Sequence, residues 1–160
     1  MAQFIDITQI AAYSSLDANI DNDSISPNID QAQINEVKRV LGTALYNKIN
    51  NDLNNEVPLT NSYLSIFNEF IIRLQVYYTC YYYLSLTVIK VSQNGAYFVT
   101  PEKTQSLTLP ELKEMANMYK ALAVGIELNF IDALNLLNLP ERPAPSSIKA
   151  NSTFNWIRIK

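Results

Sequence analysis

The pattern of apolar and polar positions predicts one long helix from Asn61 to Val91. No proline or glycine interrupts this stretch, and apolar side chains recur every three or four residues, the spacing of a buried helical stripe. Further apolar residues, including Tyr82 and Ile89, fall outside the stripe. A helix that is apolar on several sides needs cover on several sides, so we expect its tyrosines to fill the core or to meet a neighbouring subunit.

Shorter helices are predicted before this central one. Asp6 and Gln9 have the spacing of a capping box, which indicates a short helix near the N-terminus. Ser26 followed by Pro27 is typical of a helix start, because serine caps the first turn and proline has no N–H to leave unpaired. Gly42 predicts a break between two helices.

The segment after the central helix carries an ambiguous signal. Residues 93–95, Gln-Asn-Gly, form either a left-handed helix cap or a tight hairpin turn. We favour the cap because the predicted helix runs directly into it. Residues 97–100 and 105–107 are short extended runs, which predict a small β excursion near 96–108.

A second long helix is predicted after this excursion. Thr108 and Glu111 have capping-box spacing, and Pro140 lies just beyond the last periodic residue. Its expected buried stripe is Leu112, Met115, Tyr119, Leu122, Ile126, Phe130, Ala133 and Leu137. The predicted core combines both long helices through Leu74, Tyr78, Tyr81, Leu122 and Ile126.

The last residues form a distinct segment. The sequence PERPAP at 140–145 cannot continue a helix, and the chain then ends on FNWIRIK. We predict an all-α fold, an antiparallel bundle over residues 1–139 with long central helices, followed by an extended C-terminal arm over 140–160. An aromatic and apolar terminus is unusual, so we expect this arm to bind a partner, the alternative being that it folds back and covers helix surface of its own bundle. The candidate partner-binding residues are Phe154, Trp156, Ile157, Arg158, Ile159 and Lys160.

Composition narrows the function classes. The formal charge is −3 and the pI about 4.9, which disfavours tight nonspecific binding to nucleic-acid phosphates. There is no histidine, and Cys80 is the only cysteine, so we expect no catalytic constellation, no metal site and no cofactor. Charges such as Glu69 and Lys90 interrupt the apolar runs, which argues against a transmembrane span, and residues 1–10 do not read as a secretory signal.

The assembled pattern resembles the head-tail connector (adaptor, or head-completion) proteins of tailed bacteriophages, of the crAss-like type. The resemblance is carried by Ile29-Asp30-Gln31-Ala32-Gln33, by Leu41-Gly42-Thr43-Ala44-Leu45-Tyr46, and by the two long helices with the Gly95 connection between them. It covers most of the chain from Ile7 to Leu139 and rests on helix-packing signatures without chemistry.

What the resemblance implies is a structural virion protein at the head-tail junction, made in the host bacterial cytoplasm. Its partners would be the portal protein, neighbouring copies of itself in a ring, commonly of twelve, and other tail or connector proteins. DNA would pass through the ring without sequence-specific binding, for which an acidic balance is suitable. The alternatives are a helical interaction or regulatory adaptor inside the cell, without catalytic activity, and a helical enzyme or cofactor-binding bundle.

Overall fold

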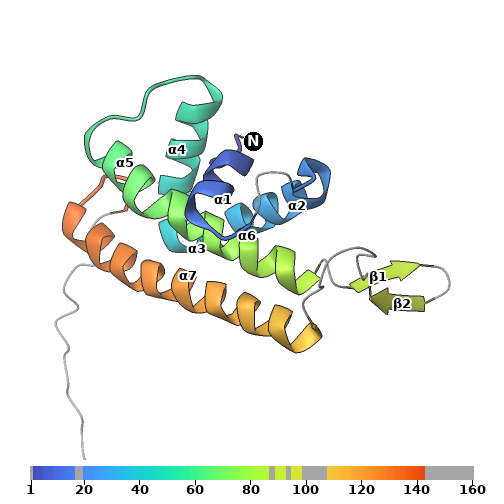
Figure 1. Ribbon diagram of the computed structural model, residues 1–160. Helices are drawn as coiled ribbons and strands as arrows, with labels where there is room; N and C mark the ends of the chain where they lie inside the picture. Colours follow the sequence, from blue (N-terminus) through green and yellow to red (C-terminus); the bar gives the residue numbers. More distant parts are fainter. Residues whose placement is uncertain (1, 17–19, 87–88, 93–94, 99–107, 143–160) are drawn as a thin grey trace, which may run out of the picture.

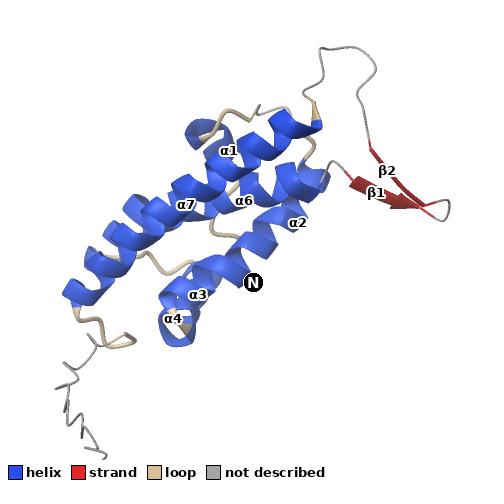
Figure 2. Cartoon of the chain, turned by 90° about the horizontal axis from the view of Figure 1, so that it is seen from below, coloured by secondary structure: helices blue, strands red, loops and turns tan. Residues whose placement is uncertain are grey.

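The computed structural model describes residues 2–16, 20–86, 89–92, 95–98 and 108–142, most of which are helical (Figures 1 and 2). The helices are α1 (Ile7–Tyr13), α2 (Asn22–Ala32), η1 (Gln33–Val37), α3 (Lys38–Leu41), α4 (Thr43–Asn54), α5 (Asn61–Ile66), η2 (Phe67–Ile71), α6 (Ile72–Leu86) and α7 (Leu109–Leu137), where η1 and η2 are single π-helical turns. The prediction of a helical fold is confirmed.

The first helix forms as its capping signal predicts. The Asp6 carboxylate accepts hydrogen bonds from the backbone N–H groups of Thr8 and Gln9, at 2.9 and 3.1 Å. In return the Gln9 side chain accepts the Asp6 N–H at 2.8 Å. These bonds satisfy donors that have no partner within the helix, which fixes the start of α1.

The predicted start of α2 at Ser26–Pro27 is wrong. The helix begins at Asn22, behind Asp21 as N-cap, and Pro27 lies inside it. Proline in a helix interior removes one backbone hydrogen bond. Ile25 and Ile29 flank that position and are both fully buried, so the early start places an additional large side chain in the core and offsets the lost bond.

Gly42 separates α3 from α4, as predicted. Its backbone has φ 78° and ψ 157°, a conformation that is essentially restricted to glycine. The chain turns there, so the short α3 and the longer α4 point in different directions (Figure 1). Leu41 and Leu45, on either side of the turn, are both buried.

The central helix is shorter than predicted. It runs without a break through α5, η2 and α6 from Asn61 to Leu86, not to Val91. Beyond it, β1 (Ile89–Ser92) pairs antiparallel with β2 (Gly95–Phe98), with Ser92 opposite Gly95. The predicted helix cap at Gly95 is therefore wrong, because Gly95 is the first residue of β2 and pairs with Ser92. The second predicted strand, residues 105–107, lies outside the described residues.

Helix α7 lies along α6 and runs in the opposite direction (Figures 1 and 2). At one end the ring of Phe130 on α7 stacks on Phe70 of η2, with centroids 5.0 Å apart. At the other end Leu112 of α7 and Leu84 of α6 line the same cavity. The capping box of Thr108 and Glu111 is present, and the helix ends at Leu137, ahead of Pro140 as predicted.

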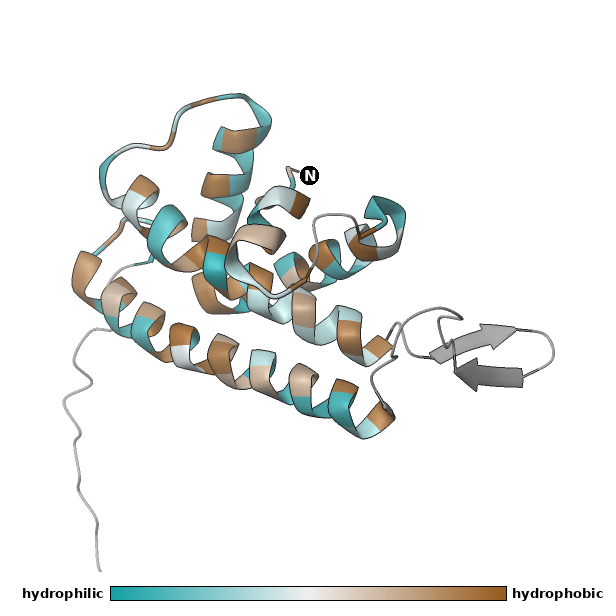
Figure 3. Ribbon diagram, in the orientation of Figure 1, coloured by the Kyte–Doolittle hydropathy of each residue, from teal (hydrophilic) through white to brown (hydrophobic). Residues whose placement is uncertain are grey.

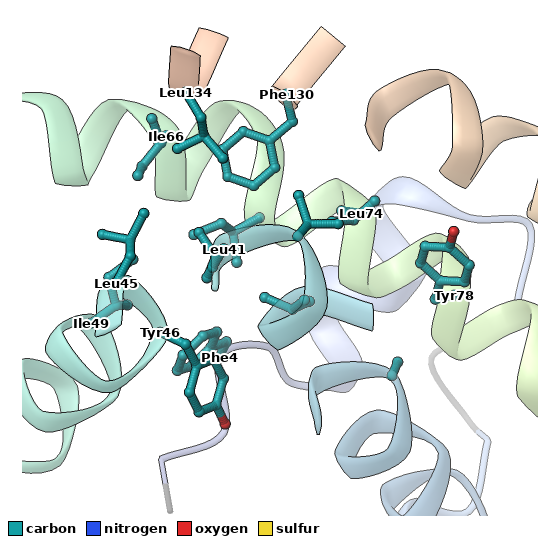
Figure 4. Close-up of a cluster of buried hydrophobic side chains, with 14 of the residues drawn as sticks. Phe4, Leu41, Leu45, Tyr46, Ile49, Ile66, Leu74, Tyr78, Phe130 and Leu134 are labelled. Atoms are coloured by element: carbon teal, nitrogen blue, oxygen red, sulfur yellow. The ribbon is translucent and has the colours of Figure 1, made fainter. Parts of the chain in front are cut away.

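Two hydrophobic clusters fill the interior. Figure 4 shows the larger one, in which Phe4 from the N-terminal segment lies against Tyr46 of α4, with ring centroids 5.5 Å apart. Leu74 and Tyr78 are buried there as predicted. Burial of each such side chain stabilises the fold by about 2 kcal/mol.

The predicted core position of Leu122 is wrong, because 44% of its surface is exposed. Helix α7 instead buries Ala116, Tyr119, Ala123, Phe130 and Leu134 against α6 and its neighbours. The small side chains of Ala116 and Ala123 let α7 approach α6 closely. The apolar stripe through Leu122 lies to one side of this contact.

Two glutamines form a polar link inside the core. The Gln33 side chain donates to the Ala2 carbonyl at 2.8 Å and accepts the Phe4 N–H at 3.0 Å. Gln75 of α6 donates to the Gln33 carbonyl oxygen at 3.1 Å. This chain of bonds ties the N-terminal residues, which precede α1 and belong to no helix or strand, to the central helix.

The chain after α7 returns to the helical body. The Tyr63 hydroxyl on α5 donates to the Glu141 carboxylate at 2.7 Å, and the Arg142 guanidinium donates to the Val40 carbonyl of α3. Contacts with the body thus continue to Arg142, beyond the predicted boundary at 139. The predicted arm from residue 143 onward lies outside the described residues.

Candidate interaction surface

One side of α7 carries apolar residues that no described element covers. Met118, Ala121, Gly125, Leu128 and Leu136 recur every three, four or eight positions, so they share one side of the helix, and Leu122 lies beside them. All six are exposed, Leu128 at 61% and Met118 at 48%. We call these six residues the α7 outer face. In Figure 3, hydrophobic positions recur along the whole of α7.

Carboxylates lie on the same side of α7. Glu111 and Glu114 precede Met118 at the spacing of the stripe, and Asp132 lies between Leu128 and Leu136. The two lysines of α7 lie elsewhere: Lys120 sits over the Tyr81 ring at 5.3 Å, and Lys113 lines a cavity beside α6. The α7 outer face is therefore apolar from Met118 to Leu128, with carboxylates before this stretch and one after it, ahead of Leu136.

A depression of about 430 Å³ opens at the N-terminal end of this stripe. Its described lining residues are Glu111, Glu114, Met115 and Met118. Methionine side chains are flexible and polarisable, and they adapt to partners of different shape. Two methionines beside two carboxylates suit a partner that offers an apolar or aromatic group together with a cation.

The opposite edge of α7 takes part in a polar cluster. The Glu127 carboxylate accepts two bonds from Arg39 at 2.8 and 2.7 Å and one from the Tyr78 hydroxyl at 2.9 Å. Arg39 also bonds Glu36 at 2.9 Å, and the Tyr82 hydroxyl donates to Glu36 at 2.6 Å. The cluster joins η1, α3, α6 and α7.

The titration behaviour of this cluster indicates a structural role. The hydrogen bond from Arg39 lowers the pKa of Glu127, which stays ionised at neutral pH. Burial, with the hydrogen bond to Glu36, raises the pKa of Tyr82 to about 12, and burial raises the pKa of Tyr78 as well. Both phenols remain protonated donors, so the cluster holds the helices together without exchanging protons near neutral pH.

A second cavity, of about 240 Å³, lies between the end of α6 and the start of α7. Its lining is mainly apolar, from Tyr81, Leu84, Leu112 and Ala116, with Lys113 also lining it. It offers space for a small apolar group. No cluster of catalytic side chains among the described residues surrounds it.

The described residues include few groups suited to metal binding or thiol chemistry. There, no group of three or more acidic or cysteine side chains stands close enough to hold a metal ion. Burial raises the pKa of the Cys80 thiol to about 11, so it is protonated at neutral pH and shielded from reagents. None of the helices in the described part of the chain has the length and apolar character to span a membrane.

None of the six predicted partner-binding residues lies in the part of the chain that the structure describes. Phe154, Trp156, Ile157, Arg158, Ile159 and Lys160 all lie outside the described residues. The α7 outer face was not predicted as a surface. The signal was present, because α7 carries apolar residues on more than one side, but the pattern alone does not say which side packs against α6.

Comparison with known proteins places the chain in a family. Residues 37–136, which contain α3 to α6 and all of α7 except Leu137, match the family model described as a family of unknown function, DUF6712. The chain belongs to the DUF6712 family. The DUF6712 match includes the whole α7 outer face and the Arg39–Glu127 pair. No curated protein and no solved structure matches the chain.

Proposed function

We propose that this protein is a structural subunit of a ring at the head-tail junction of a tailed bacteriophage, where it docks on the portal and forms part of the DNA channel. The observation that carries the proposal is the α7 outer face. Isolated exposed leucines are ordinary on protein surfaces, but a contiguous apolar stripe rimmed by charges marks an interaction site. A ring subunit has two neighbours and needs such surfaces.

Two further features support the proposal. The chain resembles connector subunits in the order of its helices and in the short signatures around Ala32 and Gly42. The net charge of −3 is also suitable for a channel, because a basic wall would hold the phosphates of passing DNA. The polar cluster and the glutamine link give the subunit a rigid body on which to present α7.

The first test is whether the protein is a component of the particle. Quantitative mass spectrometry of purified virions should give this chain in a fixed ratio to the portal protein, in ring-like copy number. Electron cryomicroscopy of the same particles should place its helical body beneath the portal. Absence of the chain from purified particles would reject the proposal and leave a host-cell adaptor as the better reading.

The second test changes the surface itself. Leu122→Glu places a charge on the α7 outer face, and Leu64→Glu on α5 is a matched control, because both leucines are 44% exposed. We expect Leu122→Glu to reduce the fraction of capsids joined to tails, and Leu64→Glu to leave it unchanged, in complementation of a phage that lacks the gene. Equal melting temperatures would show that both variants fold. Equal assembly of the two would contradict the role of α7.

A further inference from the structure

We propose that the α7 outer face receives the C-terminal segment of a second copy of this chain, with Phe154 and Trp156 on the apolar stripe and Arg158 and Lys160 against its carboxylates. The inference rests on the proposed function, since the ring supplies the second copy. It names the occupant of a surface that the described residues leave open.

Chemical complementarity is the first argument. The C-terminal residues 143–160 contain Lys149, Arg158 and Lys160 and no acidic side chain. The stripe on α7 contains Glu114 and Asp132 and no lysine or arginine. Opposite charges at the rim of an apolar contact fix its register and favour the correct partner.

Side-chain shape gives the second argument. The depression beside Glu114 is lined by Met115 and Met118, which adapt to a large ring. In an extended chain Phe154 and Trp156 project to one side, while Ile157 and Ile159 project to the other. Phe154 and Trp156 can therefore face the methionines together. Arg158 and Lys160 follow two and four residues after Trp156.

The path of the chain after Arg142 indicates whether the C-terminal segment on α7 comes from the same copy or from a second one. Arg142 is bonded to the Val40 carbonyl on α3, which holds the origin of the segment on the inner side of the molecule. From Arg142 to Phe154 the fully extended chain spans about 40 Å. From Leu137 to Glu114 the helix itself is about 35 Å long. Within one copy the linker would have to leave from the side of α7 that faces α3 and pass around α7 to reach the outer face, at a cost in chain entropy, so a second copy is the better donor.

Disulfide trapping in the full-length protein tests this geometry. One population carries Ala121→Cys on the α7 outer face, and an isotopically labelled population carries Ser152→Cys, which shares the side of Phe154 and Trp156 in an extended chain. The mixed proteins are assembled, oxidised and analysed by mass spectrometry for a disulfide between light and heavy chains. Ala44→Cys on α4 is the control for Ala121→Cys, because both alanines are exposed helical residues. The buried Cys80 is common to all samples.

We expect the Ala121 pair to cross-link between copies at about ten times the yield of the Ala44 pair, because docking raises the local concentration of the segment. Equal yields would overturn the proposal. A chain carrying both Ala121→Cys and Ser152→Cys would also overturn it if it formed only an internal disulfide. If the protein is present in the ring of the particle but the Ala121 cross-link does not form, the proposed function stands and the docking of the C-terminal segment on α7 is wrong.

Charge reversal gives an independent readout. Glu114→Lys should reduce the Ala121 cross-link roughly fivefold, the size expected for a lost surface ion pair, and Arg158→Glu in the other population should restore it. Glu69→Lys on η2 makes the same change of charge at another exposed position and should have no effect. A cross-link that is insensitive to all three changes would reject the role of the carboxylates.

Discussion

Arg39 and Glu127 form a two-point ion pair across 88 residues of sequence, with nitrogen to oxygen distances of 2.8 and 2.7 Å. The planar guanidinium and the carboxylate match in geometry, which makes such pairs stronger than single contacts. Because the same carboxylate also accepts the Tyr78 hydroxyl, one side chain of α7 is tied to both α3 and α6. This contact joins α7 to its neighbours along the edge opposite to the α7 outer face.

Removing the Glu127 carboxylate should lower the free energy of unfolding more than removing the Arg39 guanidinium. Glu127→Ala leaves Arg39 and the Tyr78 hydroxyl without this acceptor, and we expect the free energy of unfolding to fall by about 1–3 kcal/mol. Arg39→Ala should cost less than about 1 kcal/mol, because half of that side chain is exposed and its charge is screened by water. Urea unfolding of both variants and of the double variant measures their coupling. Additive effects would mean that the pair contributes nothing beyond its separate contacts.

Two residues of α7, one buried and one exposed, should differ widely in the stability lost on truncation to alanine. Phe130 is fully buried and stacked on Phe70, so Phe130→Ala should cost about 3–5 kcal/mol. Leu122 lies on the α7 outer face, so Leu122→Ala should change the stability of the monomer by less than about 0.5 kcal/mol. Denaturant titration of the two variants at concentrations where the protein is monomeric checks this order. A large loss of stability in Leu122→Ala would mean that Leu122 is buried, as the sequence predicts.

Local chemistry was enough to predict several elements. The capping boxes at Asp6 and Thr108 depend on residues three positions apart, and the turn at Gly42 depends on one residue. Sequence therefore locates these boundaries directly. It does not locate the start of α2, because the burial of Ile25 and Ile29 outweighs the unfavourable Pro27, and burial is a property of the whole fold.

The candidate surface was harder to predict for the same reason. Helix α7 has apolar residues on two sides, and only the packing of Ala116, Ala123 and Phe130 on its neighbours shows which side is free. The Arg39–Glu127 pair carries no local signal, since its partners are far apart in sequence. The Asn-Gly signal fitted both a cap and a hairpin, and the end of α6 at Leu86 leaves room for the hairpin.

Stability should decline at alkaline pH. Burial raises the pKa of Cys80 from 9.0 to about 11 and that of Tyr82 from 10.0 to about 12. A group with a raised folded-state pKa contributes its full stability below the unfolded pKa and loses it as the pH rises through the folded value. The melting temperature should therefore begin to fall near pH 9 and continue to fall to about pH 12. Tyr82→Phe should make the fall shallower above pH 10, and an unchanged slope would contradict this assignment.

A buried hydroxyl gives a prediction in the stabilising direction. Thr79 on α6 is fully buried, and its hydroxyl has no hydrogen-bond partner among the described residues. Valine has the same shape without the polar atom, and removing an unsatisfied buried group recovers its desolvation cost. Thr79→Val should raise the free energy of unfolding by about 1 kcal/mol. A clear loss of stability would indicate a bound water at this position.

Gly42 and Gly125 should respond in opposite directions to the same substitution. Gly42 has φ 78° and ψ 157°, so Gly42→Ala should cost about 1–3 kcal/mol although the added Cβ meets nothing within 4 Å. Gly125 lies in regular helix with equally open space, so Gly125→Ala should stabilise the monomer by about 1 kcal/mol. Thermal unfolding of the two variants measures the difference. Equal shifts would show that the Gly42 backbone is not strained by a side chain.

A substitution at Gly125 should weaken association without lowering the stability of the monomer. It lies in the middle of the α7 outer face, between Ala121 and Leu128, where a missing side chain lets a partner approach the helix. Gly125→Leu adds a side chain that points into open space in the monomer, so the melting temperature of the monomer should not fall. In the assembly the same side chain occupies the partner's position, and we expect association to weaken by about tenfold, equivalent to about 1.4 kcal/mol. Ala44→Leu, at an exposed position on α4, should leave association unchanged in sedimentation or light scattering. If Gly125→Leu associates as tightly as Ala44→Leu, partners do not approach α7 at this point, and the apolar stripe is a surface without a binding role.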